Sequence, residues 1–78
     1  MFQRKQVIDY WNQRIELKKA RWSPETREKF ERALRVLDQD VANSLNELNR
    51  NPHDEVWEQM LNQSLNDKIG FLKDYSDL

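Results

Sequence analysis

Two prolines divide the 78-residue chain into three segments, and each stands where a helix can begin. Pro24 follows Ser23, and Pro52 follows Asn51. Proline is tolerated at the first position of a helix, and a preceding Ser or Asn can accept a hydrogen bond from a free backbone N–H of the first turn. Proline also disfavours the α conformation of the residue before it, so Ser23 and Asn51 mark helix boundaries. We therefore predict helices near residues 3–21, 24–49 and 52–75.

Apolar residues recur at intervals of three or four in all three segments, which is the pattern of amphipathic helices. No stretch alternates apolar and polar residues with a period of two, so strands are not expected. A helix over residues 24–49 would be about 39 Å long, which exceeds the width of a globule of this size. The predicted fold is all-α, a long antiparallel hairpin of the second and third helices with an N-terminal helix added to form an elongated three-helix bundle.

The residues expected at the helix contacts form one apolar stripe on each helix. The stripes of the second and third helices would face each other, and the first helix would add its own. These packing residues are Ile8, Trp11 and Ile15 in the first helix, Leu34, Leu37, Val41, Leu45 and Leu48 in the second, and Trp57, Leu61, Leu65, Ile69 and Leu72 in the third. Gly70 is the weak point of the third helix, because Gly costs about 1 kcal/mol relative to Ala inside a helix. Two explanations for a glycine here are open: Phe71 beside it needs the room, or the helix ends there.

The length of the chain limits its core. Folding of a chain this long buries only about 63% of the unfolded surface, which leaves little room for a deep cleft. Self-association into a larger bundle would cover the long apolar stripes. We expect one domain over residues 1–78, with another protein or a second copy of the chain as its partner.

Residues that carry enzyme chemistry are scarce. The sequence has no Cys and a single Gly, so it holds no thiolate metal site, no Cys nucleophile and no glycine-rich phosphate loop. Its one His, His53, lies beside Asp54 and Glu55 but lacks the three or four converging ligands of a zinc site, and is expected in the exposed first turn of the third helix. We predict no catalytic residue, no metal and no cofactor.

The net charge of −1 conceals an uneven distribution. Residues 1–35 hold ten Lys and Arg against five acids, a balance of +5, whereas residues 36–78 hold three against nine, a balance of −6. Such asymmetry can draw the two halves together in an antiparallel fold or place a basic surface near an anionic partner. Nucleic-acid binding is disfavoured, because acids share the basic half and a phosphate-binding domain concentrates its basic residues on one face.

Several segments together resemble the helical region that follows the membrane span in some bacterial anti-sigma factors. The resemblance covers approximately residues 8–74. It rests on Tyr10-Trp11 through Glu16-Leu17, Phe30-Glu31-Arg32, Leu37-Asp38-Gln39 leading to Leu45-Asn46-Glu47-Leu48, Asn51-Pro52-His53-Asp54-Glu55, Met60-Leu61, Leu65-Asn66-Asp67-Lys68-Ile69 and Leu72.

In that family a zinc-finger-like cytoplasmic segment holds the sigma factor, a single helix crosses the membrane, and the external helices sense or bind a signal. The zinc-binding and membrane-spanning segments do not occur in this sequence, so the resemblance implies an external, periplasmic part of a longer protein. The basic first helix would then lie nearest the membrane, where Arg14, Lys18, Lys19 and Arg21 could meet lipid phosphates. The alternative is a free-standing cytoplasmic helical adaptor or structural oligomer.

Overall fold

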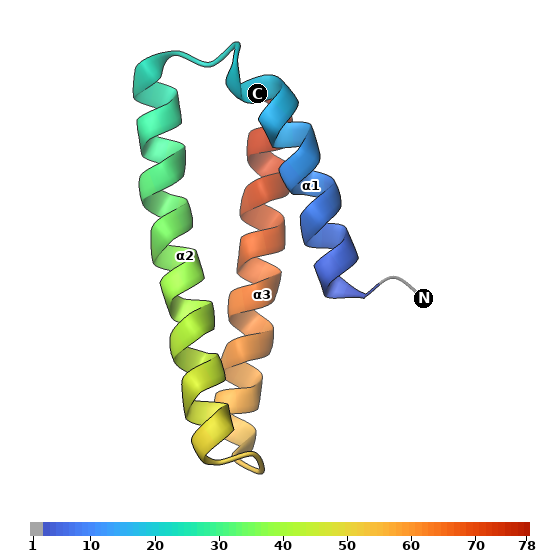
Figure 1. Cartoon of the computed structure of the whole chain (residues 1–78), viewed down its shortest axis with the longest axis vertical. Helices are drawn as coiled ribbons and strands as arrows, with labels where there is room; N and C mark the ends of the chain where they lie inside the picture. The colour runs from blue at the N-terminus through green and yellow to red at the C-terminus, as the bar shows by residue number, and fades with distance from the viewer. Residues whose placement is uncertain (1–2) are drawn as a thin grey trace.

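The computed structural model describes residues 3–78 as three helices, which confirms the all-α prediction. They are α1 (Arg4–Lys19), α2 (Pro24–Arg50) and α3 (Glu55–Ser76). In Figure 1, α3 lies between the other two helices and runs antiparallel to α2. Both α1 and α2 pack along α3, and they barely touch each other. The third helix is therefore the element that holds the fold together.

The molecule is elongated, with extents of 44 × 29 × 14 Å and a radius of gyration of 14.0 Å. A compact domain of this length would have a radius of gyration of about 11.5 Å. The radius of gyration is larger because the α2–α3 hairpin is long and extends beyond α1. In Figure 1, α1 covers only the part of α3 that leads to its C-terminus.

The start of α2 follows the local signals in the sequence. Ser23 has an extended backbone, and its hydroxyl accepts a hydrogen bond from the N–H of Thr26 at 3.2 Å. Pro24 occupies the first helical position, where a missing N–H is harmless. The predicted boundary at Ser23 is confirmed.

The predicted start of α3 at residue 52 is wrong by three residues. Asn51 instead ends α2, where its N–H donates to the carbonyl of Glu47 at 3.0 Å. The helix begins after Asp54, whose carboxylate accepts from the N–H groups of Val56 and Trp57 at 3.0 and 3.4 Å. A carboxylate at this position satisfies two free N–H groups and also suits the helix dipole, so Asp54 takes the capping role that we had assigned to Asn51.

The first helix ends at Lys19, two residues earlier than predicted. Two backbone hydrogen bonds close the turn that follows α1. The N–H of Arg21 donates to the carbonyl of Lys18 at 2.9 Å, and the N–H of Trp22 donates to the carbonyl of Lys19 at 3.1 Å. This tighter turn directs Trp22 into the core, where it is buried. Burial of the large apolar ring favours this early end, while the indole N–H has no hydrogen-bond partner in the described part of the chain.

The core lies at the end of the molecule where the α1–α2 connection meets the C-terminus of α3 (Figure 1). Its buried apolar residues are Ile15, Trp22, Phe30 and Leu72. Phe30 is the centre of an aromatic cluster, with ring centroids 5.1 Å from Trp22, 5.3 Å from Phe71 and 5.1 Å from Tyr75. These separations are typical of favourable aromatic pairs, so this end of the fold carries most of the packing energy.

The α2 seam differs from the predicted one at its centre. Ser44 is only 3% exposed, whereas Leu45, predicted to pack in the seam, is 45% exposed. Starting from Phe30, steps of four and three residues lead through Leu37 and Val41 to Ser44, a regular 3.5-residue repeat that keeps one stripe facing α3. Leu45 lies one position further round the helix and leaves this stripe.

The remaining predicted packing residues are buried or half-buried. Ile15 and Leu72 are buried, and the half-buried ones are Ile8, Trp11, Leu34, Leu37, Val41, Leu48, Trp57, Leu61, Leu65 and Ile69. Two residues of α3, Asn62 and Ser76, contact α1 through Arg4 and Lys18. By helical spacing Leu65 and Ile69 share that face, so they lie toward α1 and not toward α2 as predicted.

Gly70 lies inside α3, which continues to Ser76. The helix therefore does not end at Gly70, and a Cβ atom added there would meet nothing within 4 Å apart from its two neighbours in the chain. We expect Gly70→Ala to raise the free energy of unfolding by about 1 kcal/mol, because Gly has greater conformational freedom in the unfolded chain. Urea unfolding followed by circular dichroism measures the change, and Ala42→Gly, at an exposed site inside α2, is the matched control with the opposite sign. A loss of stability in Gly70→Ala would contradict the open space seen here.

Candidate functional site

Two residues of the predicted basic surface, Lys18 and Lys19, make contacts within the fold. The ammonium of Lys18 donates to the carbonyl of Ser76 at the end of α3. A cation is stabilised at this position because the carbonyl end of a helix is negative. Lys19 pairs with Glu16 at 3.2 Å, and its ammonium lies 5.4 Å from the centre of the Phe30 ring. Both lysines therefore contribute to the packing of α1.

The other two predicted basic residues are exposed. Arg14 donates to the hydroxyl of Tyr10 at 3.1 Å, and its guanidinium lies 5.8 and 5.7 Å from the rings of Tyr10 and Trp11. Arg21 is exposed in the turn after α1. The basic surface that could face lipid phosphates is thus smaller than the sequence predicted, and membrane binding stays a prediction.

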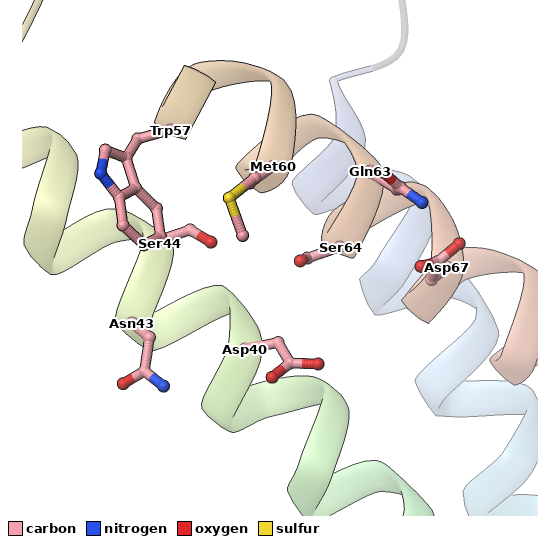
Figure 2. A pocket seen from close by; sticks show the side chains of 8 residues that line it. All are labelled: Asp40, Asn43, Ser44, Trp57, Met60, Gln63, Ser64 and Asp67. Atoms are coloured by element: carbon pink, nitrogen blue, oxygen red, sulfur yellow. The ribbon is translucent and has the colours of Figure 1, made fainter. Parts of the chain in front are cut away.

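A hollow of about 370 Å³ lies between α2 and α3, toward their connecting turn (Figure 2). Ser44 of α2 and Ser64 of α3 stand on either side of it, and both hydroxyls point into it (Figure 2). The seam is lined with large apolar residues elsewhere, and two small side chains at the same level leave space unfilled. The hollow is therefore a direct consequence of these two serines.

The two ends of the hollow differ in polarity. Trp57 and Met60 form one end with an indole ring and a thioether, while Asp40 and Asp67 supply a carboxylate from each helix at the other (Figure 2). Within residues 3–78, neither of these carboxylates forms an ion pair. The hollow combines an apolar wall, two hydroxyls and an anionic end, and the side-chain amides of Asn43 and Gln63 complete its lining.

A neighbouring ion pair fixes the alignment of the two helices. Lys68 of α3 donates to the carboxylate of Asp38 on α2 at 2.5 Å, and the Lys68 side chain is mostly buried. A charged pair at one level of an otherwise apolar seam favours a single alignment of the helices. Ser44 and Ser64 are thereby held at the same level.

The sequence pattern did not predict a site at either serine. The available signal was a small polar residue at a seam position of each helix, and it becomes visible only when the alignment of the two helices is known.

The structure places His53 outside α3, exposed in the turn between α2 and α3, which corrects the predicted first-turn position. In the described part of the chain, no group of three or more His, Asp or Glu residues is arranged to hold a metal ion. None of the described helices combines the length and the apolar character that a bilayer span requires.

No protein-family model matches the chain, and neither curated proteins nor solved structures gave a match.

Proposed function

We propose that this chain is a non-enzymatic helical interaction module that acts by associating with further copies of itself. The observation that carries this proposal is its accessible surface of 6117 Å². A compact monomer of 9.6 kDa would expose about 5,100 Å². The excess, about 1,000 Å², is close to the roughly 800 Å² that each partner buries in a standard protein interface.

Large apolar side chains on the surface support the same proposal. They are Tyr10 and Leu17 on α1, Val36 and Leu45 on α2, Val56 and Met60 on α3, and Leu78 after α3. Leu45 is the best placed for a contact, because Val41 and Leu48 on the adjoining turns are half-buried and extend the apolar surface beside it. A second copy packed along this edge would cover the stripe.

Sedimentation equilibrium from micromolar to millimolar concentration tests self-association. We expect an apparent mass that rises from 9.6 kDa toward a multiple of it. Leu45→Glu should shift this rise to higher concentration, because a charge would be brought into the contact, with no loss of helical circular dichroism. Glu31→Gln, at an exposed polar site of the same helix, serves as the control. A constant mass of 9.6 kDa at all concentrations would rule out the proposal.

The setting that we propose for this module is the extracytoplasmic part of a membrane-anchored anti-sigma factor that regulates transcription. Its support is the sequence resemblance over approximately residues 8–74. An antibody raised against this chain should detect a larger, membrane-bound species in the source cells. A free 9.6 kDa species would instead favour a cytoplasmic adaptor.

A further inference from the structure

Ser44 breaks the packing pattern of the α2–α3 seam at a stability cost. Its side chain is 3% exposed and stands where the repeat places a large apolar residue. Its hydroxyl makes no hydrogen bond to any other residue in the described chain, and it points into the hollow (Figure 2). The hydroxyl opens into the hollow and is not sealed in the core, so its cost is the apolar packing that a larger side chain would supply at this position. Departures from a local packing rule without a structural gain are expected at functional sites.

The groups around the hollow are arranged to complement an elongated ligand with two different ends. The carboxylates of Asp40 and Asp67 come from different helices and favour a cation between them. The ring of Trp57 and the thioether of Met60 at the opposite end favour an apolar group. The serine hydroxyls between these ends can accept hydrogen bonds from an ammonium.

The size of the hollow limits the ligand. A volume of about 370 Å³ is near the lower end of the range for small-molecule sites. A bare metal ion is a poor fit, because two carboxylates fall short of the ligand sets that proteins use for Ca²⁺ or Zn²⁺. The geometry favours a small organic molecule over an ion.

We propose that the hollow between Ser44 and Ser64 is a binding site for a small amphipathic organic ammonium ion. The ammonium lies between Asp40 and Asp67, and the apolar portion lies against Trp57 and Met60. Met60 belongs to both this site and the exposed apolar surface described above, but none of the charged groups of the site is needed for contact through Leu45. The aspartate variants therefore test ligand binding separately from self-association.

The test is a titration of the full chain with 2-phenylethylammonium, followed by the amide and indole signals in ¹H–¹⁵N NMR spectra. 2-Phenylethanol, which has the same ring but no charge, is the comparison ligand. We expect shifts centred on Ser44, Ser64 and the Trp57 indole, with the ammonium binding about tenfold more tightly than the alcohol because of its charge-assisted contacts. Equal affinity for the two ligands, or shifts centred elsewhere, would overturn the assignment.

Variants locate the cation. Asp40→Asn combined with Asp67→Asn should reduce the affinity for the ammonium to that for the alcohol. Asp74→Asn removes the same type of charge from an exposed position of α3 outside the hollow and should leave the affinity unchanged. An equal effect of both changes would show general electrostatic attraction only and would overturn the proposal. Both aspartates of the hollow are exposed, so these variants are expected to fold.

The variant Ser44→Leu tests whether the ligand binds in the hollow itself. The larger side chain should fill the hollow, raise the melting temperature and abolish binding of the ammonium. Binding that survives in a folded Ser44→Leu variant would contradict the proposed location. If this variant does not fold, the aspartate substitutions decide the question.

Discussion

Replacing Phe30 with Ala should destabilise the chain by about 3–5 kcal/mol, because it removes a fully buried ring and leaves a cavity. Phe30 is 1% exposed and contacts three other aromatic rings in the core. The total stability of a chain this long is about 4–12 kcal/mol, so the variant should lose a large part of it and unfold at a clearly lower temperature. Thermal denaturation followed by circular dichroism at 222 nm measures the loss.

Tyr10→Ala is the control for Phe30→Ala. Tyr10 is an aromatic residue on the exposed surface of α1, so its removal should change the free energy of unfolding by less than about 1 kcal/mol. Equal destabilisation by the two substitutions would show that the aromatic cluster around Phe30 is not the centre of the fold.

Leu72→Ala should lower the free energy of unfolding by about 2–5 kcal/mol. Leu72 is completely buried in the core, in the part of α3 that α1 covers. Because α1 and α2 both depend on contacts with α3, a cavity at this position weakens the attachment of both helices. Urea unfolding gives the change in free energy. A single transition would show that the three helices unfold together, and more than one would show that α1 separates first.

Leu17→Ala makes the same chemical change at an α1 position that is 80% exposed. Its expected effect is within about 0.5 kcal/mol of zero. Comparable losses for Leu72→Ala and Leu17→Ala would contradict the burial of Leu72 between the helices.

Local features of the fold could be predicted from the sequence because their signals lie within a few residues. Ser23 and Pro24 define the start of α2 without reference to the rest of the chain. The same kind of local signal predicted the wrong start for α3, since Asn51 and Asp54 are both good capping residues and the proline follows Asn51. The turn decides between them, because the carbonyl of Asn51 accepts from the N–H of Asp54 at 3.0 Å and leaves the Asp54 carboxylate free to cap.

Features that depend on the relative placement of two helices could not be predicted in this way. Leu45 and Ser44 both lie at helical spacing from Val41, and one helix alone does not say which of them faces its neighbour. Lys18 is 58 residues from its acceptor, the carbonyl of Ser76, so no neighbouring residue in the sequence indicates this contact. The hollow follows from two serines on different helices, and it exists only once their alignment is set.

The core is concentrated at one end of α3, and we expect the α2–α3 hairpin to become weaker across the two serines toward its turn. Native-state amide hydrogen exchange measures this directly, because protection reports the free energy of local opening. We expect the strongest protection around Phe30 and Leu72, with protection falling past Ser44 and Ser64 toward residues 51–54. Protection near the turn as strong as that around Leu72 would contradict it.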